Sequence, residues 1–162
     1  MKVAYKLGND ISTDHIYPGR YMATVLPTET PAFAFGDMAD LNKLLNEGDK
    51  SETRILLAGN NFGTGSSREQ AVSTLVGHNL IIIAKDFARI FFQNSINLGL
   101  KTIACPEIEA EVGDEIEISN EKVINKTQGK EFRVIPIPEA RKAIVEAGGL
   151  IAYTRKLLLN EK

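Results

Sequence analysis

The sequence predicts an α/β fold with a mixed sheet whose core strands are parallel. Three short apolar runs, at 54–58, 80–84 and 102–105, are typical of buried strands. Helical apolar spacing separates them at 67–78 and 86–97. A strand–helix–strand–helix–strand order at this spacing requires crossover connections, so we expect a parallel core flanked by helices.

The N-terminal third predicts one strand, a long connection and one helix. Residues 1–7 alternate apolar and polar side chains, which indicates a strand. Residues 8–37 contain several prolines and little periodicity, so we expect a long loop of the kind that is usually functional or mobile. A short helix is expected over 39–45, ending near Gly48.

The pattern changes after Pro106 and predicts an antiparallel β extension followed by a helix. The expected strands lie at 108–112, 116–118, 123–127 and 132–137. The carboxylates from Glu107 to Glu117 alternate with apolar residues, so a solvated strand face explains them better than a metal site. The C-terminal helix, 138–159, is expected to break at Gly148-Gly149.

Length and composition favour one globular domain over residues 1–162, without nucleic-acid or membrane partners. The formal net charge is −2, which provides no broad positive field for nucleic acid and no basic membrane anchor. No apolar run approaches the roughly 20 residues that span a bilayer. The N-terminus lacks a signal-peptide pattern, and a single cysteine suits a reducing compartment, so we expect a cytoplasmic protein.

The chain is not expected to bind a metal by itself. Cys105 is the only cysteine, and His15 and His78 are the only histidines. A metal site built from several cysteines of this chain is therefore excluded, and a histidine-rich zinc site within this chain is not expected. If a metal takes part in the chemistry, most of its ligands must come from another chain.

The segment from Gly59 to Glu69 is the strongest candidate site. It lies between a predicted strand and a predicted helix, where open α/β sheets place their ligands. An anion-binding loop, Gly63-Thr64-Gly65, leads to the start of the helix, and the guanidinium of Arg68 suits a carboxylate or phosphate. The segment matches neither the P-loop pattern nor the dinucleotide-binding pattern.

A structural explanation of the same segment is equally specific. Ser66-Ser67-Arg68-Glu69 fits a capping box, with Ser66 as the N-cap and Glu69 at the third helical position. Residue chemistry alone favours capping. Only the glycines and Arg68 make a catalytic role competitive.

The second candidate segment runs from Asn9 to Arg20. Asp14 next to His15 combines an acid with a group that titrates near neutral pH. Turns formed by Asn, Asp, Ser and Thr side chains would also explain such a cluster. The distance between this segment and Ser66 does not follow from the sequence.

Three stretches carry a resemblance to a known family: GNDISTDHIYPGRYM, GNNFGTGSSREQAV and IIIAKDFARIFFQNSINLGL. Together they resemble the small subunits of 3-isopropylmalate dehydratase, which share the swivel domain of the aconitase superfamily. The resemblance extends from the N-terminus to about Cys105. It implies a hydro-lyase of leucine biosynthesis that moves a hydroxyl group between neighbouring carbons of a dicarboxylate by dehydration and rehydration.

The same resemblance implies that this chain binds no cofactor and works with a partner. The family's large subunit holds a [4Fe-4S] cluster through three cysteines, and its open iron acts as a Lewis acid on the substrate. We therefore expect a heterodimer or heterotetramer with a large iron–sulfur subunit.

By motif, the resemblance assigns roles to individual residues. Ser66 would be the base that removes and returns the carbon-bound proton, Ser67 and Arg68 would bind substrate carboxylate, and Asp14 would handle protons near the leaving hydroxyl. The helix start and Arg68 would stabilise a serine alkoxide. Further substrate contacts are expected from Thr13, His15 and Arg20, although Arg20 could also be structural.

The residues that follow Arg20 are expected to select the substrate. In the family, this stretch contacts the variable substituent, and an additional arginine there suits the extra carboxylate of homoaconitate. Here the loop is Tyr21-Met22-Ala23-Thr24, which contains no arginine and favours an uncharged substituent. A homoaconitase small subunit, or that of another dehydratase of substituted malates, remains the alternative. A non-catalytic module that binds a dicarboxylate or phosphate, with Ser66 only a cap, is the alternative from another class.

Overall fold

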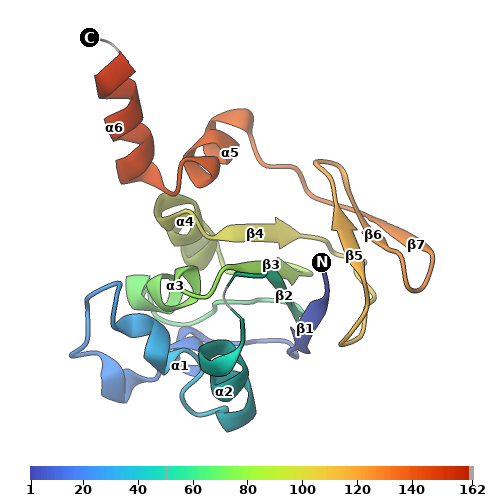
Figure 1. The fold of residues 1–162 in the computed structure, drawn as a ribbon, viewed down its shortest axis with the longest axis horizontal. Helices are drawn as coiled ribbons and strands as arrows, with labels where there is room; N and C mark the ends of the chain where they lie inside the picture. Colours follow the sequence, from blue (N-terminus) through green and yellow to red (C-terminus); the bar gives the residue numbers. More distant parts are fainter. Residues whose placement is uncertain (50, 161–162) are drawn as a thin grey trace.

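A four-stranded parallel sheet forms the centre of the molecule in a computed structural model that describes residues 1–49 and 51–160 (Figure 1). The strands follow chain order across the sheet: β1 (Val3–Lys6), β2 (Arg54–Ala58), β3 (Leu80–Ala84) and β4 (Lys101–Ala104). Their neighbouring pairs are all parallel. The parallel core predicted from the apolar runs is confirmed.

Helices cover one face of this sheet. α3 (Glu69–Val76) connects β2 to β3, and α4 (Arg89–Leu98) connects β3 to β4. Leu56 and Ile82 face the same core cluster as residues of α1 (Thr13–Ile16), α2 (Ala39–Glu47), α3 and α4. The connection 8–37, expected to be a loop, also contains two 3₁₀ turns, η1 (Gly19–Tyr21) and η2 (Thr30–Phe33).

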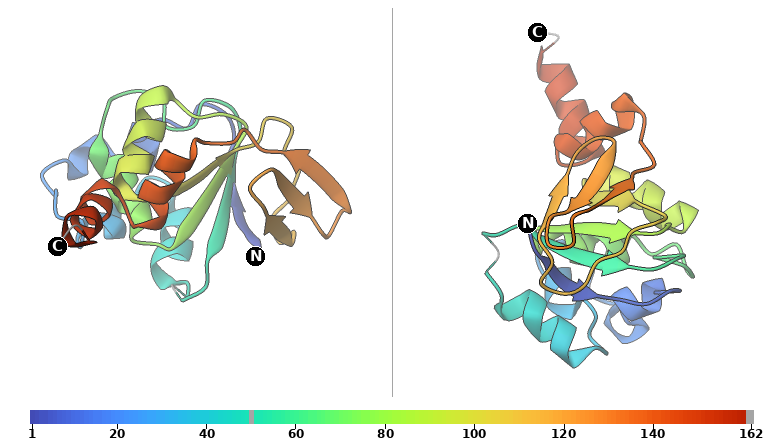
Figure 2. Two further views of the ribbon diagram at one scale, coloured as in Figure 1. Left: turned by 90° about the horizontal axis from the view of Figure 1, so that it is seen from above. Right: turned by 90° about the vertical axis from the view of Figure 1, so that its right-hand side faces the viewer.

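A separate antiparallel sheet covers the opposite face (Figure 2). It consists of β5 (Ile116–Ile118), β6 (Lys122–Asn125) and β7 (Lys130–Arg133). The expectation of one mixed sheet is corrected in this respect, because the antiparallel strands form a layer of their own. The strand expected at 108–112 is absent from the described chain, although Ile108 and Ala110 are buried between the layers.

The C-terminal helix breaks at Gly148-Gly149, as predicted. α5 (Glu139–Glu146) and α6 (Leu150–Asn160) meet there, and both glycines have positive φ. Gly149 lies so close to the end of α4 that an added Cβ would be 2.6 Å from the carbonyl oxygen of Asn97. α6 extends away from the body of the molecule (Figure 1). In the described ranges, no helix is both long and apolar enough to cross a bilayer.

Candidate active site

The two candidate segments lie side by side at the carboxyl edge of the parallel sheet. One follows β1 and the other follows β2, so the parallel arrangement brings both to the same edge. The Gly63 N–H donates to the Ile11 carbonyl at 2.7 Å, and the Thr13 N–H donates to the Thr64 carbonyl at 2.8 Å. Backbone pairing therefore holds the anion-binding loop against the segment that carries Asp14.

Polar side chains connect the three loops that follow β1, β2 and β3. The Asn9 Oδ1 accepts from the Asn60 backbone N–H at 2.8 Å, and the Asp86 Oδ1 accepts from the Asn61 N–H at 2.6 Å. The Asn61 amide donates to Asp10 at 2.9 Å. The sequence does not predict these supporting roles, and residue type is their only indication in it. Asp10 and Asn61 have φ of 55° and 58°, a conformation that Asn and Asp tolerate better than most residues.

Gly63 and Gly65 shape the loop itself. Gly63 has φ of +81°, and an added Cβ would lie 2.1 Å from the ring of Phe91 on α4. Gly65 has φ of +98°, and its added Cβ would lie 3.3 Å from the Thr13 Oγ1. Only glycine combines this backbone conformation with such close packing. The chain therefore turns sharply just before Ser66.

The predicted capping box is wrong. α3 begins at Glu69, its N-cap is Arg68, and no side chain of the described residues caps it. Arg68 has an extended backbone, so the helical conformation starts later than expected and Glu69 is the first helical residue instead of the third. Ser66 and Ser67 are exposed, and the structure shows no partner for their hydroxyls within the described chain. The uncapped N–H groups of α3 and the Ser66 hydroxyl both stay available to an anionic ligand.

Arg68 and Asp14 form an ion pair between the two segments. The Arg68 Nη1 contacts the Asp14 carboxylate and also lies 3.5 Å from the Tyr17 carbonyl oxygen. The Arg68 side chain is 20% exposed, whereas that of Asp14 is 57% exposed. The Nε and Nη2 groups of Arg68 have no partner in the described residues, so the bidentate edge of the guanidinium is available to a carboxylate.

Three other predicted substrate contacts occupy different environments. His15 is exposed, and its Nδ1 accepts the Ser12 N–H at 3.0 Å, which places the proton of the neutral ring on Nε2. Thr13 is buried next to Gly65, and its Oγ1 has no hydrogen-bond partner in the described residues. Arg20 pairs with Asp37 at 2.5 Å and lies 4.5 Å above the Tyr21 ring, which favours the structural alternative.

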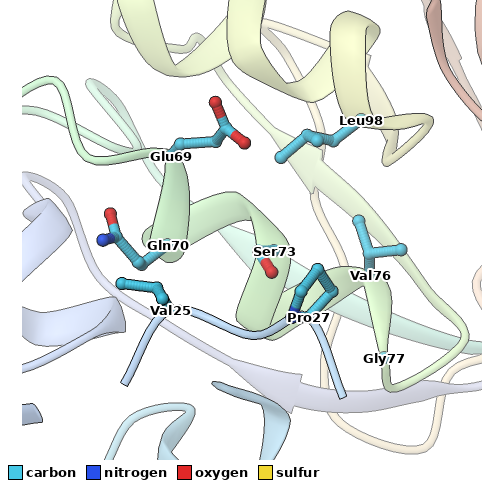
Figure 3. Close-up of a pocket in the computed structure, with 8 residues that line it drawn as sticks. All are labelled: Val25, Pro27, Glu69, Gln70, Ser73, Val76, Gly77 and Leu98. Atoms are coloured by element: carbon cyan, nitrogen blue, oxygen red, sulfur yellow. The ribbon is translucent and has the colours of Figure 1, made fainter. Parts of the chain in front are cut away.

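The loop Tyr21–Thr24 begins close to Asp14 and Arg68. An added Cβ at Gly19, just before it, would be 3.6 Å from the Asp14 Oδ1 and 3.9 Å from the Arg68 Nη1. Just after it, the chain borders a cavity of about 460 Å³ (Figure 3). That cavity is lined by Val25, Pro27, Glu69, Gln70, Ser73, Val76, Gly77 and Leu98. The loop thus begins near Arg68 and ends at a cavity that Glu69 and Gln70, which follow Arg68 in the chain, also line.

Residues of this chain do not fit an iron–sulfur cluster. Cys105 is buried, and its thiol donates to the Arg133 carbonyl at 3.3 Å. Burial raises the pKa of the Cys105 thiol to about 11, which disfavours the thiolate that a metal requires. Across 1–49 and 51–160, no three His, Cys, Asp or Glu residues are grouped to hold a metal ion.

Comparison with known proteins identifies the family of the chain. The Aconitase C-terminal domain family matches residues 23–108. The 3-isopropylmalate dehydratase small subunit of Methanosarcina mazei is 42% identical over 160 residues, covering 96% of each chain. The isopropylmalate/citramalate isomerase small subunit of Methanocaldococcus jannaschii is 40% identical, covering 94% of this chain and 91% of the relative.

A solved structure of a related protein has the same fold. The crystal structure of a 3-isopropylmalate dehydratase from Methanocaldococcus jannaschii matches with a TM-score of 0.86 and 35% sequence identity. The match covers 99% of this chain and 95% of the other. The swivel-type α/β fold and the resemblance found in the sequence are confirmed, and the chain belongs to the family of 3-isopropylmalate dehydratase small subunits.

Proposed function

We propose that this chain is the small subunit of a 3-isopropylmalate dehydratase and supplies one half of an active site. The observation that carries the proposal is the backbone pairing that places the anion-binding loop, just before Ser66, against the segment with Asp14. Both segments leave functional groups exposed at one edge of the sheet. A large iron–sulfur subunit would cover this edge and complete the site.

Ser66 is proposed as the base of the reaction. Its hydroxyl is exposed and engaged in no described contact, so it is free to face a substrate. It accepts the carbon-bound proton during dehydration and returns it during rehydration. A serine alkoxide is strongly disfavoured in water, so the uncapped start of α3, the nearby Arg68 and exclusion of water by the partner must all stabilise it.

Arg68 and Asp14 are proposed to act as a pair. The free edge of the Arg68 guanidinium binds a substrate carboxylate, and its ion pair with Asp14 keeps that edge oriented. Asp14 retains an exposed carboxylate, which is suited to donate or accept a proton at the departing hydroxyl. Ser67, exposed beside them, provides a second contact to substrate carboxylate.

The uncharged loop Tyr21–Thr24 supports a substrate with an apolar substituent. Ala23 is exposed and small, and no arginine in the loop could pair with an additional carboxylate. The name of the relative from Methanocaldococcus jannaschii adds a citramalate-type substrate to those worth testing. Isopropylmalate remains the preferred assignment, within leucine biosynthesis. Location in the cytoplasm stays a prediction, which subcellular fractionation would check.

Reconstitution tests the proposal directly. The purified chain and a purified large subunit are mixed anaerobically and assayed with 2-isopropylmalate, homoaconitate and citramalate. We expect turnover of 2-isopropylmalate by the pair and none by either protein alone. Absence of turnover with isopropylmalate would refute the assignment, and preferred turnover of homoaconitate would replace it with the alternative. Calorimetric binding of malate by the isolated chain, without any effect of the partner, would favour a binding module instead.

A further inference from the structure

The hydroxyl group of Tyr17 spans the two ends of the loop Tyr21–Thr24. Tyr17 is fully buried directly after α1. Its hydroxyl oxygen lies 3.0 Å from the Tyr21 carbonyl oxygen and 3.0 Å from the Thr24 carbonyl oxygen. The Thr24 N–H donates to the same Tyr21 carbonyl at 2.9 Å, which closes the turn. One phenol proton is therefore shared between the two carbonyls that bound the loop.

The hydroxyl remains a donor over the whole physiological pH range. Burial is the main cause that raises the pKa of the Tyr17 phenol above its ordinary value of 10.0. A deprotonated phenol would face two carbonyl oxygens with no proton between them. The contact is therefore a constant feature of the loop and does not switch with pH.

Within the described residues, aromatic packing holds only the first residue of the loop. The Tyr21 ring stacks on Phe33 with centroids 4.4 Å apart, and the Arg20 guanidinium covers it. Met22 is half-buried against the core, whereas Ala23 is exposed. The position of Ala23 and Thr24 therefore depends on the backbone turn, and the Tyr17 hydroxyl is the side-chain group that supports this turn.

Tyr17 also contacts the other side of the site through its own backbone. Its carbonyl oxygen lies 3.5 Å from the Arg68 Nη1, and Gly19 two residues later lies against Arg68 and Asp14. Val25, which follows the loop, borders the same cavity as Glu69 and Gln70 at the start of α3 (Figure 3). A shift of the loop relative to Arg68 would thus change the space beside the substrate carboxylate.

We propose that Tyr17 is a positioning residue for substrate choice, whose hydroxyl holds the main chain of Tyr21–Thr24 at a fixed distance from Arg68. The inference rests on the proposed function. Without the hydroxyl, the Thr24 carbonyl loses its donor in the described residues, whereas the Tyr21 carbonyl keeps the Thr24 N–H. A partly buried acceptor without a donor is costly. The loop then moves toward water to hydrate the Thr24 carbonyl, which displaces Ala23 and loosens the fit around the variable substituent.

The test compares Tyr17→Phe with Tyr5→Phe in the reconstituted enzyme. Each change removes one phenol oxygen and keeps the ring, and the Tyr5 hydroxyl has no partner in the described chain. For Tyr17→Phe we expect amide hydrogen exchange of residues 22–25 to accelerate about five- to tenfold. We also expect KM for 2-isopropylmalate to rise more than kcat falls. The ratio of kcat/KM for 2-isopropylmalate to kcat/KM for citramalate should drop about three- to tenfold. Tyr5→Phe should leave these quantities unchanged.

The outcomes separate the inference from the function on which it rests. Unchanged exchange of 22–25 in Tyr17→Phe would overturn the inference, as would faster exchange with an unchanged ratio between the two substrates. An equal loss of kcat/KM for both substrates would assign Tyr17 a purely structural role and also overturn it. If the unmodified pair turns over neither substrate, the proposed function fails together with the inference.

Discussion

The two sheets of this chain use charged side chains in different ways. On the antiparallel sheet and its flanks, Lys122, Lys126 and Lys130 pair with Glu131, Glu117 and Glu109, and every partner is roughly half exposed. Such surface pairs contribute little to stability. At the edge of the parallel sheet, the mostly buried Arg68 joins Asp14 across two loops from different strands.

Topology explains the difference. Parallel strands send all their carboxyl ends to one edge, so the loops after β1, β2 and β3 converge there. Antiparallel strands alternate in direction, so the turns of β5–β7 are distributed between two edges. The same ion-pair chemistry therefore forms a candidate site on one sheet and a solvated face on the other. Four predictions test this contrast, in order of decreasing expected effect.

Ser66→Ala should produce the largest change. Removing the proposed base should lower kcat of the reconstituted enzyme about 10²- to 10⁴-fold. Its hydroxyl makes no described contact, so the melting temperature of the isolated chain should stay within about 1 °C. Steady-state kinetics and thermal unfolding measure the two effects. Retained turnover would show that Ser66 is not the base.

Gly63→Ala should destabilise the chain by about 2–4 kcal/mol. The added methyl combines a strained positive φ with a collision against Phe91. The matched control is Gly129→Ala in the turn between β6 and β7, where φ is +67° and an added Cβ meets nothing within 4 Å. It should cost only about 1–2 kcal/mol. Urea unfolding compares them, and equal losses would contradict the close packing of the anion-binding loop.

Asp114→Asn should remove part of the acid sensitivity on the antiparallel side. The Asp114 carboxylate accepts from the Glu111 N–H, Asn125 and Gln128, which together lower its pKa below the ordinary value of 3.8. The stabilisation that the ionised Asp114 carboxylate contributes is therefore present above pH 3.8 and is lost as the pH falls through the lowered pKa. The variant should be less stable at pH 7, and the difference should shrink below about pH 4. A difference independent of pH would contradict this.

Cys105 should show the smallest effect, since it should not react. With a pKa of about 11, its buried thiol holds little thiolate at pH 8. Mass spectrometry should detect no iodoacetamide adduct on the folded chain and complete labelling in denaturant. Fast labelling of the folded chain would show that the layer between the two sheets opens.

The sequence predicted what depends on local pattern. The apolar runs at 54–58 and 80–84 became β2 and β3 with the expected bounds, and the glycine pair at 148–149 broke the C-terminal helix. Residue types and spacing also identified both candidate segments. These features depend on periodicity and on glycine, which act over a few residues.

Contacts between residues far apart in the chain do not follow from local sequence patterns. Asn9 and Asn60 are 51 positions apart, and only the parallel sheet brings them into contact. The predicted capping box is wrong because Gly65 has a positive φ and Arg68 has an extended backbone, so α3 begins only at Glu69. The Ser-x-x-Glu pattern does not predict these backbone conformations. The two hydrogen bonds of Tyr17 also depend on a folded connection without periodicity.

A competition experiment tests most directly whether the exposed edge is half of a shared site. A fixed amount of large subunit, saturated with the unmodified chain, is titrated with the Ser66→Ala chain while turnover of 2-isopropylmalate is followed. The account predicts that the variant binds equally well, so turnover should fall in proportion to its fraction and approach zero. Turnover that does not fall, because the variant either fails to compete or supports the reaction, would contradict the account.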